Sequence, residues 1–380
     1  MPAFRSGVVR AILAERSGLQ KVTVDLGGEA PEPSYVLTQL IGDVASGDPV
    51  VVNTTAVDLG LGTGGWHFVH WNLARRDLDV AGPGHIMKLR YTSAQCDTGS
   101  AEEHHLELAD VTDIAGLPVV VAGLHSQLAG AALAARLTRP GARIAYVMTD
   151  GAALPLALSD LVAALSERAI IDTTITCGHA FGGDHEAVTL ASGLAIARHV
   201  AAADLAIVAM GPGIVGTGTA LGHTGVEVGV ALDVVTALGG HSIAALRASA
   251  GDDRDRHRGL SHHTVTALGV LARGRCEIAI PDGEPDLLAE VTDAGLAERH
   301  DLRQVATLDI VAAFADAGLE IRSMGRDAAA DPILHRCAAA AGVYAARSLT
   351  NTPIAAPTAA PTARTPLDTA EVGPRGAGAA

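Results

Sequence analysis

Short apolar runs separated by turn residues dominate the first hundred positions of the chain. The runs with the length and content of β-strands lie at 7–13, 20–26, 34–41, 49–53 and 85–91. GG, PEP, SGD and GPG turns lie between these runs. Strands this short and closely spaced are typical of a small barrel or sandwich. The pattern predicts a small β-barrel-like domain over residues 1–105.

From about residue 116 the chain alternates between apolar runs and alanine-rich stretches of helical length. The runs that resemble strands buried on both faces lie at 118–122, 143–148, 170–176, 205–210, 242–247 and 277–280. The intervening helical stretches lie at 127–137, 156–168, 186–202, 226–238 and 264–272. Strand–helix alternation predicts a mostly parallel, doubly wound α/β sheet over residues 106–349. Its last part, 285–349, is mostly helical, with a possible strand at 318–324.

The final segment has a different composition from the rest of the chain. Residues 350–380 are mostly Pro, Ala, Thr and Gly, with almost no aliphatic periodicity. Such a segment buries too little apolar area to offset its chain entropy. We expect residues 350–380 to be disordered.

Charge and hydropathy restrict the classes of partner. The 380 residues include 27 Lys+Arg and 42 Asp+Glu, a net charge of −15, which argues against nucleic-acid binding because phosphate contacts need clustered cations. No window approaches the ~18 uninterrupted apolar residues of a membrane span, and the N-terminal residues lack the apolar core of a signal peptide. Four widely spaced cysteines form no CxxC pair. These features predict a cytoplasmic protein with reduced thiols.

The loops that follow the predicted strands are rich in Gly, His and Asp, whereas the loops that precede the strands are bland, such as RPG at 139–141. Ligands of doubly wound sheets bind at the carboxyl ends of the strands. This asymmetry predicts a functional site at that edge of the sheet.

The loop GPGIVGTGTALGHTG, at 211–225, is the richest of these segments in glycine and threonine. Such a loop before a helix offers backbone N–H donors to a phosphate or carboxylate, although a mobile glycine connection is an equal alternative. The predicted ligand-binding residues of the loop are Gly211, Gly213, Gly216, Thr217, Gly218, Thr219, Gly222 and Thr224.

The same loop contains a literal GxGxxG over residues 211–216, which raises the alternative of an NAD(P)-dependent oxidoreductase. Later glycines delay the expected helix start to about Thr224. No acidic residue ends the next predicted strand, where Arg247 would at best suit the 2′-phosphate of NADP. A P-loop is excluded because no Lys-Ser/Thr closes the glycine run.

Histidines gather in the loops at the predicted edge: His125, His179, His185, His223, His257, His262 and His263. Imidazoles transfer protons near neutral pH and bind metals. We predict His223 with His262 or His263 as general acid and base, and Asp150 or Asp184 to orient an imidazole. A divalent metal held by His125, Asp184 and His185 is a variant. The alternative for each histidine alone is a structural role in a loop or helix cap.

A mixed-charge run, DDRDRHR at 252–258, follows the fifth predicted strand. Most runs of this kind are solvated surface turns. The alternative is a lid that carries Arg256 or Arg258 over an anionic ligand.

The residues predict an enzyme that acts on a small anionic metabolite by hydrolysis or group transfer. The competing interpretations are the nicotinamide-dependent oxidoreductase and a non-catalytic ligand-binding or scaffold protein. Assembly into a homo-oligomer is left open.

Four segments together resemble a known family: NTTAVDLGLGTGG (53–65), GHIMKLRYT (84–92), GIVGTGTALGHTG (213–225) and RGLSHHT (258–264). In this combination the chain, up to about residue 349, resembles the bacterial domain-of-unknown-function family 3866. The resemblance implies a bacterial cytosolic protein and carries no activity, substrate or catalytic residue.

Overall fold

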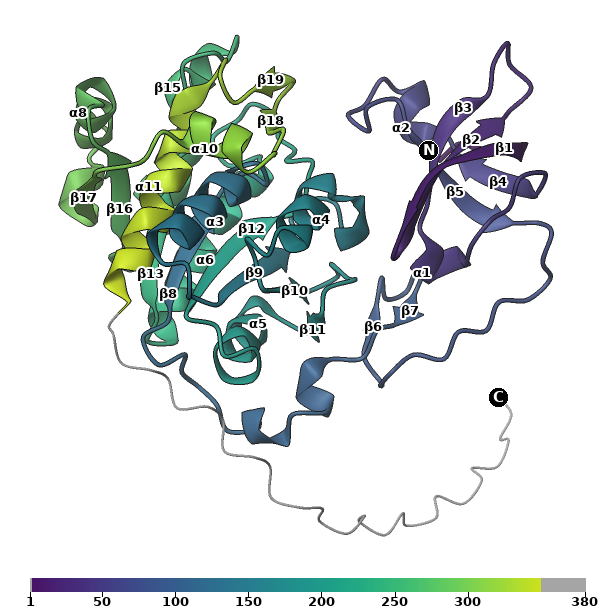
Figure 1. Cartoon of the computed structure of the whole chain (residues 1–380), viewed down its shortest axis with the longest axis horizontal. Coiled ribbons are helices and arrows are strands. Elements are labelled where there is room, and N and C mark those ends of the chain that lie inside the picture. Colours follow the sequence, from purple (N-terminus) through teal and green to yellow (C-terminus); the bar gives the residue numbers. More distant parts are fainter. Residues whose placement is uncertain (1, 350–380) are drawn as a thin grey trace, which may run out of the picture.

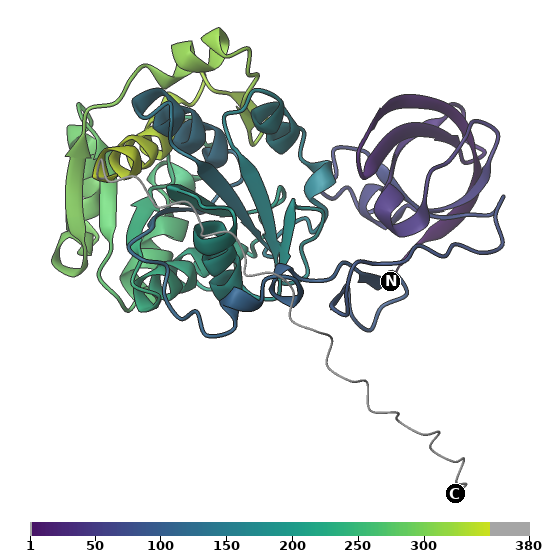
Figure 2. The same ribbon diagram turned by 60° about the horizontal axis from the view of Figure 1, so that its bottom comes forward.

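The computed structural model describes residues 2–349, so the segment predicted to be disordered, 350–380, lies outside the described residues. The N-terminal part is a closed five-stranded barrel (Figure 1, purple) with strand order β1-β2-β3-β5-β4, in which β4 pairs with β1. Figure 2 shows the ring of strands nearly end-on. The strands are β1 (Phe4–Arg16), β2 (Leu19–Asp25), β3 (Glu32–Val36), β4 (Pro49–Asn53) and β5 (His67–Asn72).

The barrel closes around a small valine-rich core. Alternate residues of β2, such as Val22 and Val24, point inward and are fully buried, as are Val50 and Val52 of β4. This is the period-two pattern of strands that face solvent on one side. The short helices α1 (Thr38–Ile41) and α2 (Thr55–Asp58) connect the strands.

The barrel differs from its sequence-based prediction in three places. The expected strand 34–41 ends at Val36, and its second half forms α1. The expected strand 85–91 shrinks to β6 (Met87–Lys88), which pairs with β7 (Cys96–Asp97) outside the barrel. Strand β5 was not predicted, because histidines and an asparagine interrupt its apolar positions.

The second part is an eight-stranded sheet with strand order β11-β10-β9-β12-β8-β13-β16-β17, in which every neighbouring pair is parallel. The predicted fold class, a parallel α/β sheet after an N-terminal barrel, is confirmed. The strands are β8 (Pro118–Ala122), β9 (Ile144–Thr149), β10 (Thr173–Cys177), β11 (His185–Ala187), β12 (Leu205–Met210), β13 (His241–Ala245), β16 (Glu277–Pro281) and β17 (Asp301–Val305).

Helices cover both faces of this sheet, because successive strand residues point to opposite sides. Val120 belongs to the core that includes side chains of α3, α4, α10 and α11, whereas Val119 and Val121 belong to the core that includes side chains of α5, α6, α8 and α9. The helices of the first layer are α3 (Gln127–Thr138), α4 (Asp160–Glu167), α10 (Ile310–Asp316) and α11 (Pro332–Ser348). Those of the second are α5 (Leu190–Ala195), α6 (Glu227–Ala237), α7 (His262–Thr266), α8 (Pro285–Asp293) and α9 (Leu296–Arg299).

Shorter elements complete the described chain. Both α5 and α7 continue as π-helical turns, Ile196–Val200 and Ala267–Leu271. The remaining pieces are 3₁₀ turns at Ala101–Glu103, Leu106–Leu108, Leu156–Leu158, Thr224–Val226 and Asp255–His257, and the strand pairs β14 (Ala248–Ser249) with β15 (Gly259–Leu260) and β18 (Arg322–Ser323) with β19 (Arg326–Asp327). Within residues 2–349 no helix combines the length and apolarity that crossing a bilayer requires.

Helices α3 and α11 lie side by side over the sheet (Figure 1) and approach each other at glycines. A β-carbon at Gly342 would overlap the carbonyl oxygen of Ala131, and one at Gly130 would lie 2.9 Å from the carbonyl oxygen of His335. The two helix backbones are therefore close enough to exclude a methyl group at these positions.

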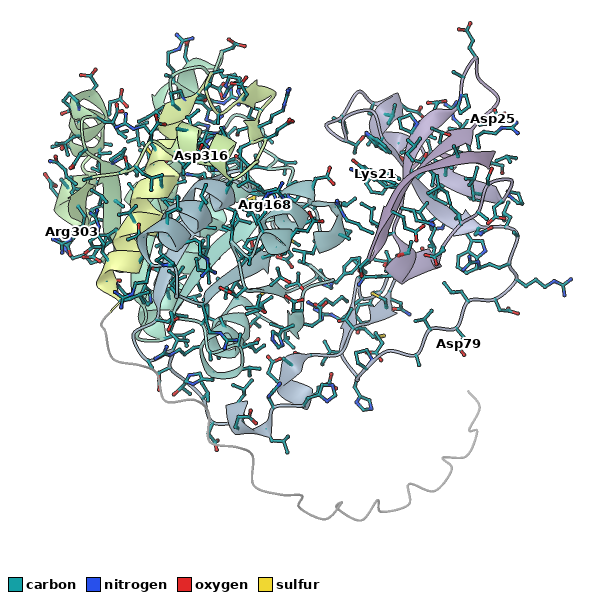
Figure 3. All side chains as sticks on the ribbon, in the orientation of Figure 1. Lys21, Asp25, Asp79, Arg168, Arg303 and Asp316 are labelled. Atoms are coloured by element: carbon teal, nitrogen blue, oxygen red, sulfur yellow. The ribbon has the colours of Figure 1, made fainter. Side chains whose placement is uncertain are left out.

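The segment between the barrel and the sheet is attached through a buried lysine. Lys88 is fully buried, and its ammonium donates to the carbonyl oxygens of Thr176 (3.0 Å) and Ala180 (2.5 Å) and to the carboxylate of Glu186 (2.6 Å). The barrel adds an ion pair between Lys21 and Asp160, with 2.8 Å between Nζ and Oδ2. Figure 3 shows Lys21 on the side of the barrel that faces the sheet domain.

His335 of α11 gives a first prediction, which concerns stability and pH. Both ring nitrogens are buried with no hydrogen-bond partner among the described residues, and the ring packs edge-on against Phe314. Burial lowers the pKa of His335 to about 4 from 6.5. Below pH 6.5 the unfolded chain therefore binds a proton that the folded chain does not, and stability falls as the pH drops towards 4.

We expect His335→Leu to stabilise the fold by about 1–2 kcal/mol at pH 7, because it removes unsatisfied buried nitrogens. The difference in unfolding free energy between His335→Leu and the wild type should grow by up to about 3 kcal/mol as the pH falls from 6.5 to 4, since each pH unit contributes about 1.4 kcal/mol. Urea unfolding at several pH values measures both effects. His125, whose burial also lowers its pKa to about 4, leaves some acid sensitivity in the variant. A stability gain that does not change with pH would contradict the lowered pKa of His335.

Candidate functional site

The strand order reverses direction at the centre of the sheet. After β8 the chain crosses to β9, which lies on one side of β8 in the sheet. After β12 the chain crosses to β13, which lies on the other side of β8. The loops at the carboxyl ends of β8, β12 and β13 therefore meet at a switch point, where ligands of such sheets bind. The loop 211–226 follows β12, and the segment 246–261 follows β13.

Four histidine rings form one cluster at this point. His223 stacks on His263 with 3.6 Å between ring centroids and 5° between ring planes, and His262 lies 4.4 Å from His263. His257 lies 4.9 Å from His262. His223 immediately precedes the turn that leads into α6, while His262 and His263 begin α7 after Ser261, whose hydroxyl accepts from the backbone N–H of His263. The cap places both α7 rings against the loop after β12.

Two ring nitrogens of this cluster are buried without a hydrogen-bond partner among the described residues. His223 Nε2 donates to the carbonyl oxygen of Ala220 (3.0 Å), so its Nδ1 carries the lone pair, and this atom is buried without a partner. His262 Nε2 is likewise buried without a partner among the described residues. His263 Nδ1 accepts from the Arg247 guanidinium at 2.7 Å.

Burial keeps these imidazoles neutral. Burial, and then the charge of Arg247, lowers the pKa of His263 to about 2 and that of His257 to about 3. The pKa values of His223 and His262 are also lowered, mainly by burial. Neutral imidazoles accept hydrogen bonds and bind metals. A pKa this low does not suit a general acid at neutral pH, so the environment of His263 does not favour the predicted acid–base role.

Arginines line a small cavity next to the histidines. The cavity has a volume of about 50 Å³, and its polar lining comes from Arg247, Arg254, Arg256, His257 and His263 together with the backbone of Gly216 and Gly218. Arg254 pairs with Asp252 at 2.8 Å. Within residues 2–349 the guanidinium of Arg256 has no hydrogen bond or ion pair, and Arg247 has no carboxylate partner within salt-bridge distance. The cavity is therefore electropositive.

The glycine-rich loop is a hairpin. Gly216 and His223 form an antiparallel β-bridge, and the N–H of Thr217 donates to the carbonyl oxygen of Gly222 (2.8 Å). Thr219 Oγ1 accepts from the N–H of Gly222, and the N–H of Thr224 donates to the carbonyl oxygen of Val215. Of the predicted ligand-binding residues, Gly216 and Gly218 line the cavity, whereas the threonines and Gly222 hold the hairpin together.

Two further glycines of the loop lie outside the cavity lining. Gly211 is buried where its backbone approaches the carbonyl oxygen of Ala153 too closely for a side chain, and Gly213 is exposed with φ +101°. The GxGxxG at 211–216 does not have the strand–turn–helix form of a dinucleotide site, because α6 begins only at Glu227.

The structure does not bring the other predicted residues into this cluster. Asp150 accepts from the backbone N–H of His179 and lines a separate cavity of about 160 Å³ with Glu227. Arg258 is exposed, pairs with Asp255 and does not line the arginine cavity.

The predicted metal set of His125, Asp184 and His185 is also divided. His125 hydrogen bonds to the carbonyl oxygen of Met210 and to the Ser159 hydroxyl. Asp184 accepts from the N–H of Thr174, and it lines, with His185, a cavity of about 670 Å³ near the barrel. The group of ligands close enough to share an ion, within the described residues, is His223, His262 and His263.

The sequence analysis assigned Arg247 only to the 2′-phosphate in the NADP alternative, and it did not include Arg254 among the ligand-binding residues. Arg247 follows β13 almost directly, and a position at the carboxyl end of a central strand was the signal that could have found it. Arg254 lies in the mixed-charge run, where the sequence does not distinguish a cavity-facing arginine from a solvated one.

Comparison with protein families matches residues 34–342 to the family described as Protein of unknown function (DUF3866). The family resemblance noted in the sequence is confirmed. No curated protein and no solved structure matches the chain.

Proposed function

This chain belongs to the family Protein of unknown function (DUF3866), and within that frame we propose that it is an enzyme that carries out hydrolysis or group transfer on a small anionic substrate. The observation that carries the proposal is the cavity lined by Arg247, Arg254 and Arg256 beside neutral histidines. A cavity of about 50 Å³ accommodates one anionic group rather than a whole metabolite, so the rest of the substrate extends into the open loop region.

Arginine suits this role because its planar fork donates two parallel hydrogen bonds to a phosphate or carboxylate. Arg254 is already bonded to Asp252, but Arg247 and Arg256 retain donors without a carboxylate partner. An anion between them would take several charge-assisted hydrogen bonds and would neutralise the positive charge there. The backbone of Gly216 and Gly218 lets the anion approach without hindrance from side chains.

The histidines supply the reactive groups next to the bound anion. One ring nitrogen each of His223 and His262 is buried without a partner, and when unprotonated such a nitrogen can bind a proton or a metal ion. These are the needs of hydrolysis and group transfer, in which a water or hydroxyl nucleophile must lose a proton. The hairpin form of the glycine loop gives no support to the nicotinamide-dependent alternative.

A pair of arginine variants tests the anion site. We expect Arg256→Met to weaken binding of inorganic phosphate or a small carboxylate about 10–100-fold, because a charge-assisted hydrogen bond contributes about 1.5–3 kcal/mol. Arg258→Met, two residues away in the same loop but outside the cavity, is the matched control and should bind as the wild type does. Calorimetric titration with phosphate, sulfate and carboxylates measures both.

Turnover is tested on the wild-type chain with panels of phosphate monoesters, carboxylic esters and amides. If the wild type hydrolyses one of these substrate classes and Arg256→Met does not, the result supports the proposal that the chain is an enzyme. Anion binding without turnover of any substrate class would favour a non-catalytic ligand-binding protein over the enzyme. Equal anion binding by Arg256→Met and Arg258→Met would overturn the anion site itself.

A further inference from the structure

We propose that His223, His262 and His263 form a three-histidine site for a divalent transition metal, with zinc as the best chemical match. The inference rests on the proposed function, since it assigns the group that would activate the nucleophile at the same cavity. One nitrogen from each ring lies within 4.8 Å of the other two. His223 and His263 are buried and His262 is partly buried.

The unpartnered nitrogens are the observation that points to a ligand. A buried polar atom without a hydrogen bond destabilises the fold, and such atoms are rare in native proteins. His223 Nδ1 and His262 Nε2 are two such atoms in one cluster. His223 Nδ1 is a bare lone pair, and His262 Nε2 is one in the tautomer that carries its proton on Nδ1; a metal ion would satisfy both.

The surroundings of His223 match those of a metal ligand. A ligating histidine usually donates its second ring N–H to a carbonyl or carboxylate, which fixes the tautomer. His223 Nε2 makes this bond to the carbonyl oxygen of Ala220, so Nδ1 is the coordinating atom. A β-carbon on Gly225 would lie 3.1 Å from this Nδ1 and 3.2 Å from His263 Nδ1, so both nitrogens border one point that only glycine leaves open.

Arg247 occupies the lone pair that the metal would take from His263. Its guanidinium donates to His263 Nδ1 at 2.7 Å, so a cation already sits against the cluster. Coordination of His263 through Nδ1 requires Arg247 to turn away, and the adjoining cavity is where its freed donors would meet the anion. Metal and anion binding would therefore support each other.

The ligand set selects the metal. Three imidazoles with one open position are a known arrangement of catalytic zinc, whose bound water loses a proton at a pH of about 7. Two zinc ligands at bond lengths of about 2.0–2.1 Å lie about 3.3 Å apart in a tetrahedral site. The described nitrogens lie within 4.8 Å of one another, and the His223 and His263 rings must turn out of their parallel stack for their in-plane lone pairs to meet at one ion.

The test is direct metal binding by the full-length chain after treatment with a chelator. We expect one equivalent of Zn²⁺ by calorimetry, and Co²⁺ to give the visible absorption of a four-coordinate nitrogen site. His262→Ala and His223→Ala should each lower the affinity at least 100-fold. The control is His199→Gln, at a histidine outside the cluster whose Nε2 bonds to the carbonyl oxygen of Asp113, and it should leave the affinity unchanged. Urea unfolding confirms that each variant is folded.

Arg247→Met gives an effect of the opposite sign. It removes the guanidinium that competes for His263 Nδ1, so Zn²⁺ affinity should rise about 10-fold or more, while phosphate affinity should fall. No stoichiometric binding of Zn²⁺ or Co²⁺ by the folded wild type, or equal loss of binding in His199→Gln, would overturn the metal site. Anion binding and turnover in the chelator-treated chain would leave the proposed function standing without the metal. Metal binding without anion binding or turnover would leave the metal site standing and overturn the proposed function.

Discussion

Lys88→Met should destabilise the fold by about 3–5 kcal/mol. The variant retains a side chain of similar length but leaves the Glu186 carboxylate, which is mostly buried, without its cation. It also leaves the carbonyl oxygens of Thr176 and Ala180 without their donor. Urea unfolding followed by circular dichroism measures the loss.

Two controls separate this effect from charge removal in general. Lys21→Met breaks an ion pair whose carboxylate, on Asp160, is largely exposed, and should change stability by no more than about 1 kcal/mol. Adding Glu186→Gln to Lys88→Met removes the unpaired charge and should recover part of the loss. Similar losses in the two single variants would show that the buried position of Lys88 has no special importance.

Gly342→Ala should destabilise the chain by about 2–3 kcal/mol, although alanine favours helices by about 1 kcal/mol over glycine. The new methyl group would overlap the carbonyl oxygen of Ala131, so α11 and α3 must separate above the sheet. The matched control is Gly269→Ala in the π-helical turn after α7, where a β-carbon meets only the Leu296 side chain at 3.6 Å.

The control should be neutral or slightly stabilising. Thermal and urea unfolding of both variants give the comparison. A gain of stability in Gly342→Ala would mean that the two helices can move apart at little cost.

Buried strands are the elements that could be predicted most closely from sequence. β8 and β12 have the bounds expected from their apolar runs, because a strand covered on both faces must be apolar throughout. β17, with the sequence DLRQV, was missed for the opposite reason. It is an outer strand with exposed side chains, so its sequence resembles a loop.

The candidate site divides along similar physical lines. A histidine in a loop after a strand is visible in the sequence, and the structure brings His223, His262 and His263 together. Contacts between loops of different strands are not visible, which is why His125 was grouped with Asp184. The direction of an arginine side chain within a charged loop depends on its ion pairs, so Arg258, bonded to Asp255, could not be distinguished from Arg256.

The two edge strands of the eight-stranded sheet also bear on how the molecule can self-associate. β11 has only three residues, and the Ser100 hydroxyl donates to the carbonyl oxygen of Glu186 within it. β17 carries Arg303, labelled in Figure 3, bonded to Glu277, and Asp301, bonded to Arg275. Short, covered or charged borders resist the addition of a foreign strand, the first step of edge-to-edge aggregation. We therefore expect any self-association to use the helical faces or the barrel rather than a continuation of the sheet.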